Sequence, residues 1–386
     1  MFTILDSKID KDKWLQEIEK TETKNYDLFL DPDFVNANLQ NSHSLGKLIV
    51  YKNMNKYFLH CFQLNKIIIK DFIIEKKNYF DISTPTGYSG SISNISDNVE
   101  LSKFRALYRN FIKKNNIIAE LIKINPLENN FKSPTANNKK FMKLTCSIDL
   151  TINDNQMFKS KQKNMISSAK SRGLSAEISF DKKFINKFKN MYHSFLKKKN
   201  ADKRYYLNSD LINFIKKKLE KKDAFFVNVL DINNNIITTG LFSLSNNLFH
   251  YLYSASLDSK KNRGSFNLMM KCAYDYGKKN KIKKIFLGGG KTSSKEDNLF
   301  KFKKRISDDT HKFFVIENIY NMKIYNLIKN IFLKNKNNFI DKNFQLILIP
   351  SMRTPKRIIE KAKAYFDSSQ IIITEVDKKA YFSALK

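Results

Sequence analysis

The chain has 386 residues, of which 42% are hydrophobic and 13% aromatic, so it is long enough for two domains with packed interiors. This composition excludes a disordered protein and a small domain held together by disulfides. The three cysteines are isolated, and the five histidines show neither metal-site spacing nor a neighbouring Ser or Cys nucleophile motif. We therefore expect no metal, a reducing compartment and structural roles for the histidines.

The formal charge at pH 7 is +33, from 70 Lys and Arg against 37 Asp and Glu. A dense basic field favours nucleic acid or an anionic membrane surface as a partner. Only eight of the basic residues are Arg, and the Lys residues accompany abundant Asn and Ile, a skew that an AT-rich coding sequence also produces. Both interpretations, an anionic partner and a lysine-rich solvated surface, stay open.

Neither a membrane span nor a signal peptide is indicated by the apolar pattern. No apolar run approaches the eighteen or so residues that cross a bilayer, and the first ten residues carry charges where a signal peptide needs an apolar core. We expect a cytoplasmic protein, with peripheral contact to the inner membrane surface as an alternative.

The first third of the chain combines β-like runs with turn clusters. Short stretches rich in Ile, Val, Phe and Tyr predict strands, and apolar residues at helical spacing predict one helix. The predicted strands are 46–51, 57–62, 67–69, 117–124 and 145–150, with a turn-rich segment at 81–97 and a helix over 101–115. We expect the first domain to end near residue 152.

The second half repeats this mixture of elements. The predicted helices are 157–171, 184–198, 209–220 and 266–279, and the predicted strands are 224–230, 236–245, 248–256 and 284–287. Residues 299–307 alternate apolar and basic side chains, as on a solvated edge. A strand at 343–350, a helix at 355–365 and a strand at 370–375 follow.

This order predicts an α+β, or mixed α/β, fold with two tandem similar domains. We expect residues 1–152 to form the first domain and 153–339 the second. The tail, 340–386, is expected to return to the first domain and pack on it.

Three segments have the composition of ligand-binding loops. Lys261, Arg263 and Gly264 precede a predicted helix, whose N-terminus attracts anions, although an ordinary helix entry has the same pattern. Three of the ten glycines stand together at 288–290, which indicates close approach to a ligand or a plain β-turn. The small residues of 84–90 suit the floor of a cleft and a surface connection equally well.

Several motifs occur in one order from about Tyr26 to Arg353. They are D-I-S-T-P-T-G-Y-S-G at 81–90, E-L-I-K-I-N-P at 120–126, a looser match at 192–201, L-G-G-G at 287–290, L-F-K-F-K-K-R-I-S at 299–307 and I-P-S-M-R at 349–353. This series resembles the FemABX branch of the GNAT acyltransferase superfamily, the type of the peptidoglycan bridge-forming aminoacyltransferases. The chain departs from the family patterns at Thr86, Lys123, Asn125 and Ile306, where the family has Tyr, Arg, His and Phe.

The resemblance implies two GNAT-like domains, an acceptor groove and acyl transfer to an amine. It assigns Lys303 to the family's F-K motif, with contact to the oxyanion or to a donor phosphate. It allows a donor or acceptor to lie against the backbone of Gly288, Gly289 and Gly290. On the acceptor side it places Gly87, Tyr88, Glu120, Lys123 and Asn125, with Glu120 as an anchor, or as a proton acceptor if burial raises its pKa.

The resulting hypothesis is an acyltransferase acting on an amine of a cell-envelope glycan or peptidoglycan precursor. The resemblance favours aminoacyl-tRNA as donor, whereas the segment 261–265 favours acyl-CoA, which would make the protein an N-acyltransferase of an amino sugar. Neither requires a bound cofactor. The alternative from another class is a non-catalytic binder of nucleic acid or of an anionic membrane surface, motivated by the charge and the departures from the motifs.

Overall fold

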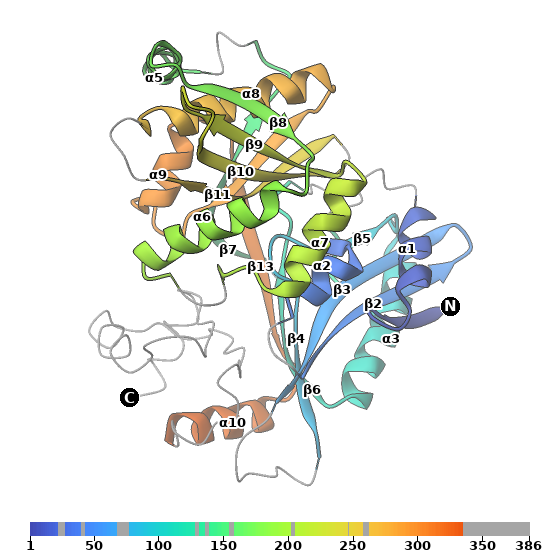
Figure 1. The fold of residues 1–386 in the computed structure, drawn as a ribbon. Helices are drawn as coiled ribbons and strands as arrows, with labels where there is room; N and C mark the ends of the chain where they lie inside the picture. The colour runs from blue at the N-terminus through green and yellow to red at the C-terminus, as the bar shows by residue number, and fades with distance from the viewer. Residues whose placement is uncertain are drawn as a thin grey trace. The chain divides into compact units, whose positions relative to one another are not determined.

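The chain is divided by its contacts into two compact units (Figure 1). A computed structural model describes residues 1–334 except 22–27, 40–42, 68–76, 128–130, 136–138, 154–157, 202–204, 246 and 258–261. Unit 1 takes the described residues of Met1–Lys24, Phe29–Met142 and Phe313–Lys386, and unit 2 those of Asn25–Leu28 and Lys143–Lys312. The elements predicted at 343–375, and the predicted packing of the tail 340–386, lie outside the described residues.

Unit 1 is a sheet of order β1-β2-β3-β4-β6-β13, with β5 beside β3. Its neighbours are antiparallel except β4 and β6, which are parallel. Its elements are β1 (Phe2–Asp6), α1 (Lys11–Glu19), α2 (Pro32–Ala37), β2 (Ser44–Asn53), β3 (Lys56–Ile67), β4 (Tyr79–Ser83), β5 (Ser91–Ser93), α3 (Asn98–Lys114), β6 (Ile117–Lys123), β13 (Thr310–Ile319, from Phe313 on) and α10 (Met322–Lys334). A 3₁₀ turn, η1 (Leu28–Leu30), precedes α2.

Unit 2 is a sheet of order β7-β12-β11-β10-β9-β8, antiparallel except for the pair β11 and β12. Its elements are β7 (Lys140–Asp149, from Lys143 on), α5 (Ser160–Ser171), β8 (Ser175–Ser179), α6 (Phe184–Lys198), α7 (Ser209–Glu220), β9 (Ala224–Leu230), β10 (Ile236–Ser245), β11 (Leu248–Ser256), α8 (Ser265–Lys279), β12 (Lys284–Gly289) and α9 (Asn298–Lys304).

Both units follow one plan. Apart from the additional short strand β5 between β4 and α3, a strand, two helices, three strands, a helix and a strand follow one another in each unit. The series is β1-α1-α2-β2-β3-β4-α3-β6 in unit 1 and β8-α6-α7-β9-β10-β11-α8-β12 in unit 2. In each unit the long helix, α3 or α8, connects the two strands that pair in parallel, as a crossover connection must. The predicted mixed α/β class and its tandem arrangement are confirmed.

The limits of the units follow strand pairing rather than chain order. From Lys143 on, β7 belongs to unit 2, where it pairs with β12, although the predicted boundary lies near residue 152. β13 pairs with β6 of unit 1, although it lies within the predicted second domain, 153–339. A sequence pattern shows where a strand lies but not which strand it pairs with. The predicted domain limits therefore differ from the limits of the two units that the residue contacts define.

In unit 2 the sheet is covered on both faces (Figure 1). Phe225, Val227 and Val229 alternate along β9 and pack in one cluster with Met269 and other residues of α8. The intervening Phe226 faces the other way, and its ring centroid lies 5.3 Å from that of Phe188 on α6. Because successive strand residues point to opposite faces and both are covered, β9 is apolar at every position except Asn228.

In unit 1 the apolar face of α3 packs on β2 and β3. Phe104, Tyr108 and Phe111 recur at helical spacing and are all buried. The ring of Phe104 stacks on Phe58 of β3 with centroids 3.9 Å apart. The helix begins at Asp97, whose side chain accepts a hydrogen bond from the Glu100 backbone N–H at 2.7 Å, a typical N-cap.

Residues 299–307 form helix α9 over most of their length, not a strand-like edge. The alternating pattern spans too few residues to distinguish the two periods. The stronger signal is Asp297, whose carboxylate accepts a hydrogen bond from the Phe300 backbone N–H at 2.9 Å and caps the helix. Phe300, in the first turn of α9, is buried. Among the described residues, no helix has the length and apolarity that crossing a bilayer requires.

Glu120 lies at the centre of β6 in unit 1 and is fully buried. Its carboxylate accepts hydrogen bonds from the hydroxyls of Tyr108 and Tyr320 and from Asn318 Nδ2, the last at 2.9 Å. His60 Nε2 lies 3.4 Å from its Oε1. Burial raises the pKa of Glu120, but the contacts with His60 and the tyrosines outweigh it, so the pKa lies below its ordinary value. The condition for Glu120 to act as a proton acceptor, a raised pKa, is therefore not met.

We predict that Glu120→Gln destabilises unit 1 at pH 7 by about 3 kcal/mol, because the charge-assisted hydrogen bonds from two tyrosines are weakened. Since the folded-state pKa is depressed, the carboxylate contributes its stability above the unfolded pKa near 4.5 and loses it as the pH falls through the folded value. The difference between variant and parent should therefore shrink at pH 4.

Urea unfolding can report on unit 1 alone, since Trp14 is the single tryptophan and is fully buried there. Its fluorescence at pH 7 and pH 4 measures both effects, and Glu19→Gln on the exposed face of α1 is the control. Equal stability of Glu120→Gln and Glu19→Gln at pH 7 would show that the buried network contributes nothing.

Candidate active site

The two parallel strands of unit 2 separate toward their carboxyl ends. β11 and β12 are paired only at Leu248, Phe249 and His250, which face Lys284, Ile285 and Phe286. Beyond these residues β11 stays with β10, and a bulge lies between Tyr251 and Tyr253, whereas β12 stays with β7. A sheet that opens between parallel strands leaves backbone groups of both without a partner strand, and ligands of α/β proteins bind at such openings.

Helix α8 begins at this same end, since the helix of a strand-helix-strand unit starts where its first strand finishes. Its N-cap is Gly264, at φ +88°, without a side-chain cap. The first backbone N–H groups of the helix therefore point outward with the positive end of the helix dipole, which suits an anion.

The predicted anion loop is only partly present among the described residues. Lys261 lies outside them. Arg263 is exposed, and its carbonyl oxygen accepts a hydrogen bond from Arg172. A Cβ on Gly264 would lie 2.5 Å from the carbonyl oxygen of Met165, so this glycine allows α8 to approach α5. The close approach expected at Gly264 is therefore to the protein's own backbone.

Lys303 stands on α9 beside the end of β12. Its Nζ donates a hydrogen bond to the carbonyl oxygen of Gly289 at 2.8 Å, and Lys143 Nζ donates to that of Gly290 at the same distance. The structure thus brings together two features that the sequence singled out separately, Lys303 and the glycine triplet. Lys143 was not predicted, because a lone lysine at a strand start has no distinguishing pattern in a lysine-rich chain.

The glycines are needed where α9 packs on β12. A Cβ on Gly290 would overlap the carboxylate of Asp297, the N-cap of α9, and one on Gly289 would lie 3.0 Å from the carbonyl oxygen of Leu144. Gly288 has φ +72°, where side chains are strained. The three glycines allow the chain to turn at the end of β12. They also allow α9 to pack closely enough for Lys303 to reach the Gly289 carbonyl.

The Lys303 side chain has a lowered pKa. Burial lowers its pKa to about 8, and the nearby Lys143 ammonium acts in the same direction. About nine-tenths of the side chains are therefore charged at pH 7, and about one-tenth at pH 9. The group can stabilise a developing negative charge at neutral pH and can also lose its proton within the physiological range.

Aromatic side chains stand near the opening. Tyr251 and Tyr253 lie on β11 just past the paired residues, and burial raises the pKa of each to about 12, so both stay protonated donors at neutral pH. The ring of Phe266, at the start of α8, lies 4.7 Å from that of Phe302 on α9. These residues were not singled out from the sequence, because aromatics at strand and helix spacing are usually core.

Four predicted acceptor-side residues gather in unit 1 at the carboxyl ends of β4 and β6. The Lys123 backbone N–H donates to Thr84 Oγ1 at 2.9 Å, which joins the loop 84–90 to the end of β6. Tyr88 packs edge-on against Phe313, with ring centroids 5.0 Å apart.

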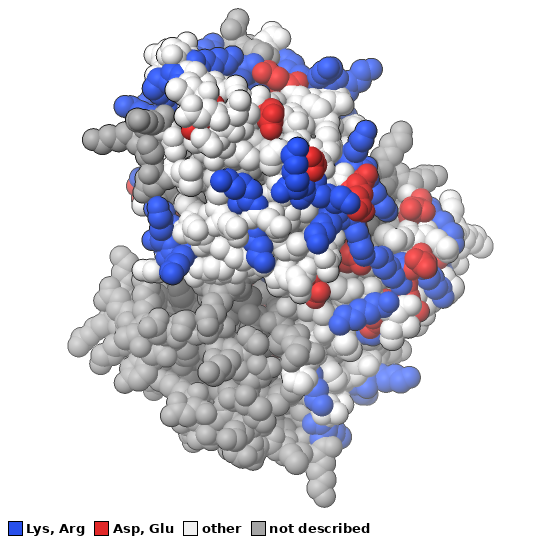
Figure 2. Space-filling model, in the orientation of Figure 1, with Lys and Arg blue, Asp and Glu red and all other residues white. Residues whose placement is uncertain are grey.

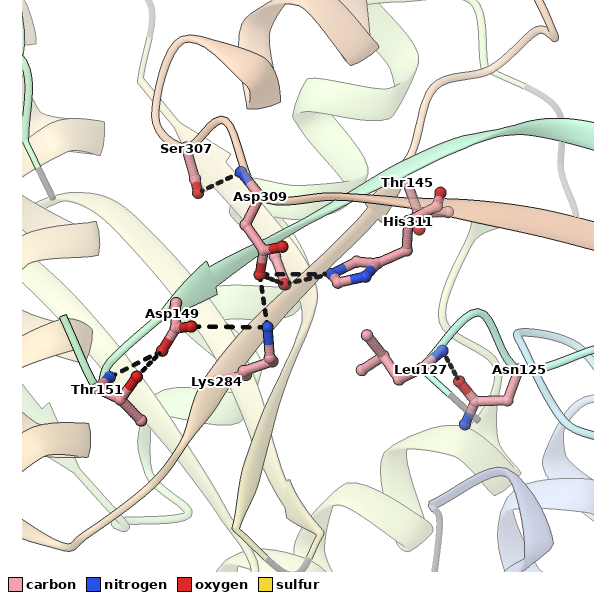
Figure 3. Close-up of polar contacts among 10 residues, drawn as sticks. Asn125, Leu127, Thr145, Asp149, Thr151, Lys284, Ser307, Asp309 and His311 are labelled. Atoms are coloured by element: carbon pink, nitrogen blue, oxygen red, sulfur yellow. Dashed lines mark hydrogen bonds and ion pairs between the residues drawn. The ribbon is translucent and has the colours of Figure 1, made fainter. Parts of the chain in front are cut away.

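Gly87 and Asn125 shape the loops of this group. Gly87 has φ +105°, and a Cβ on it would overlap the ring of Phe29. The side chain of Asn125 accepts a hydrogen bond from the Leu127 backbone N–H at 3.0 Å and closes a turn (Figure 3). Glu120, the fifth predicted residue, lies deeper in the same strand and is enclosed by the network described above.

A Ser, His and Asp group in unit 2 is not a nucleophilic triad. Ser147 Oγ donates to Asp309 Oδ2 at 2.6 Å and lies 2.7 Å from His311 Nε2, and the same Nε2 lies 3.5 Å from Asp309 (Figure 3). A triad needs the carboxylate on the other ring nitrogen. Lys284 also pairs with Asp309 at 2.7 Å, so the group ties neighbouring strands together.

No protein-family model matches the sequence, and no curated protein sequence matches it. Solved structures do match. The crystal structure of FemX aligns with a TM-score of 0.58 at 12% identity, over 84% of this chain and 99% of that chain. The structure of L-PGS from Bacillus licheniformis aligns with a TM-score of 0.51 at 11% identity, over 83% of this chain and 95% of that chain. The chain therefore has the fold of FemX and L-PGS, and the resemblance drawn from its motifs is confirmed at the level of fold.

Proposed function

We propose that the chain is an acyltransferase that moves an aminoacyl or acyl group onto an amine. The observation that carries this proposal is Lys303, whose buried cation is held on the Gly289 carbonyl beside the opening of β11 and β12. The fold shared with FemX and the motif resemblance support the same activity. Acyl transfer requires little more from a protein than positioning of the two reactants and a positive group near the oxyanion.

The chemistry balances without a cofactor. The amine nitrogen attacks the carbonyl carbon of the donor ester or thioester, and the carbonyl oxygen becomes an oxyanion. Collapse of this intermediate expels the alcohol or thiol, and the nitrogen loses one proton to form the amide. The Lys303 ammonium would offset the oxyanion charge, which is the step where a fixed cation lowers the barrier.

For the donor we favour aminoacyl-tRNA, as the FemABX resemblance implies. The alternative donor is acyl-CoA, which the uncapped N-terminus of α8 favours because its N–H groups suit a pyrophosphate. Lys303 and Arg263 fit either, since both donors carry phosphates.

For the acceptor we propose an amine of a cell-envelope glycan or peptidoglycan precursor, met at the cytoplasmic side. Its recognition would involve Gly87, Tyr88, Lys123 and Asn125, which lie together in unit 1. An acyl-CoA-dependent enzyme would instead modify an amino sugar. A non-catalytic binder of nucleic acid or of an anionic membrane surface is the alternative outside enzymes, and it follows from the charge of +33.

We predict that Lys303→Ala lowers kcat by about 100- to 1000-fold while the protein stays folded, because the oxyanion loses its cation. The assay incubates protein with amino-sugar or muropeptide precursors and offers charged tRNA and acyl-CoA pools separately, with product detected by mass spectrometry. Lys304→Ala, an exposed neighbour on the same helix, is the matched control. Turnover with only one of the two donor pools identifies the donor.

Two results would count against the proposal in this assay. Unchanged turnover in Lys303→Ala would remove Lys303 from the chemistry. No product with either donor, from parent protein shown to be folded, together with tight salt-sensitive binding of polyanions, would favour the non-catalytic binder.

We also predict that kcat/KM declines as the pH rises through about 8, because the Lys303 ammonium loses its proton there. Lys303→Arg keeps its charge to much higher pH, so any activity it retains should lack this decline. A rise in kcat/KM through pH 8 that depends on Lys303 would instead show a neutral amine acting as general base. Rates measured from pH 6 to 10 for parent and Lys303→Arg separate the two roles.

A further inference from the structure

Helix α5 of unit 2 has one buried face and one uniformly polar face. Its buried side chains are Gln162, Ile166 and Ala169. At 100° per residue, the face opposite these consists of small polar side chains, and a pair of cations flanks it on each side. The small polar residues are Ser160, Asn164, Ser167, Ser168 and Ser171, the cations are Lys161 and Arg172 on one flank and Lys163 and Lys170 on the other, and all of these are exposed.

This helix is basic even by the standard of the chain. The sequence from 155 to 176 contains no Asp or Glu, although the whole chain has 37. Lys159, just before the helix, is paired with Asp308 at 2.6 Å. The cations on the helix flanks are exposed, and Arg172 also donates a hydrogen bond to Ser168 Oγ at 2.6 Å. Figure 2 shows basic side chains along the upper edge of the view, where α5 and α8 lie in Figure 1, with few acidic ones among them.

The inner face of α5 is attached to both elements of the candidate active site. Its Met165 carbonyl meets Gly264 at the start of α8. From the flank of the helix, Arg172 donates a hydrogen bond to the Arg263 carbonyl. Gln162 donates a hydrogen bond to the carbonyl of Arg305, the C-cap of α9, the helix that carries Lys303. α5 therefore contacts both helices that border the candidate active site.

We propose that the outer face of α5 binds the phosphodiester backbone of an RNA. The proposal rests on the acyltransferase function and deepens it, since an RNA held there would be the carrier of the donor group. Hydroxyl and amide groups along the stripe would hydrogen-bond phosphate oxygens, and the flanking cations would neutralise their charge. The twelve residues of α5 extend about 18 Å, long enough to face several successive phosphates.

The same face fits other anionic partners less well. A helix that lies on a membrane buries apolar side chains among the lipids, but on α5 Ile166 and Ala169 are turned into the protein and Met165 is half-buried. A coenzyme with a few clustered phosphates is bound in a concave loop, whereas the outer side of a helix is convex. An extended polyanion matches both the shape and the length.

The test measures binding of an RNA hairpin that has a single-stranded 3′ end and carries no aminoacyl group. The result therefore does not depend on turnover. In the variant Lys161→Gln, Lys163→Gln, Lys170→Gln we expect affinity to fall at least about tenfold and the slope of log K against log salt to decrease by about 3. Gln preserves helix propensity, and thermal unfolding verifies that the variant is folded.

The matched control removes three exposed lysines from another helix of unit 2, as Lys187→Gln, Lys197→Gln, Lys198→Gln on α6. RNA affinity should change much less in the control than in the α5 variant. Equal losses would mean that only total charge matters and would overturn the proposal, as would full affinity in the α5 variant.

Vesicles containing anionic lipid serve as the second probe. Loss of vesicle binding by the α5 variant, with RNA binding intact, would assign the face to a membrane instead. Because hairpin binding is measured without turnover, this proposal and the acyltransferase function can fail separately. If the parent protein binds RNA through α5 but transfers no acyl group, the acyltransferase function is wrong and this inference stands. If it transfers the group but does not bind RNA through α5, this inference is wrong and the function stands.

Discussion

The candidate active site depends on one arrangement: a lysine ammonium held against the carbonyl of the glycine-rich end of a strand. Burying a cation is unfavourable, and the lowered pKa of Lys303 expresses that cost. Among the described residues its hydrogen-bond partner is a carbonyl oxygen rather than a carboxylate, so its charge is solvated but not neutralised. Such a cation keeps its attraction for a new negative charge, which a lysine in a tight ion pair has already lost.

The rest of the local structure follows from holding that cation in place. α9 must approach β12 closely, which requires glycine at 290, and it must begin at a fixed residue, which Asp297 secures as N-cap. β12 separates from β11 before the glycines, and a bulge in β11 lies at the point of separation. Each of these features costs some regularity in the sheet. Together they place one charged group at an opening in an otherwise closed β structure.

Much of this fold was predictable because its elements are strongly patterned. Helices α6 and α7 and strands β9, β10 and β11 occupy the ranges that the sequence predicts, since their apolar residues repeat over many positions. Pairing was not predictable, and it is pairing that assigns β7 to unit 2 and β13 to unit 1. Lys303 was found through motif resemblance, and the glycine triplet through its clustering after a predicted strand. Lys143 was missed because one lysine among many has no local signature.

Glu120 and Lys303 differ in how far the surrounding residues already satisfy their charge. Both are ionisable, mostly enclosed and part of a family-like motif. Glu120 is surrounded by two tyrosine hydroxyls, an amide and an imidazole, so its charge is fully accommodated within unit 1. A carboxylate with satisfied oxygens has little basicity left for a substrate. The difference lies in the partners, which only the fold supplies.

The same reasoning applies to the positive charge of the chain. A net charge of +33 does not distinguish a functional basic surface from a general excess of lysine, because a lysine-rich chain carries cations over its whole solvent-exposed surface. What distinguishes α5 is the combination of absent acids, an outer face of small hydrogen-bonding side chains, and attachment to both α8 and α9. Compositional skew would add lysine to any solvated helix, but it gives no reason for the acids to be absent or for the exposed stripe between the cations to consist of Ser and Asn. The arrangement of the charge, rather than its amount, is therefore what connects this surface to the site that Lys303 occupies.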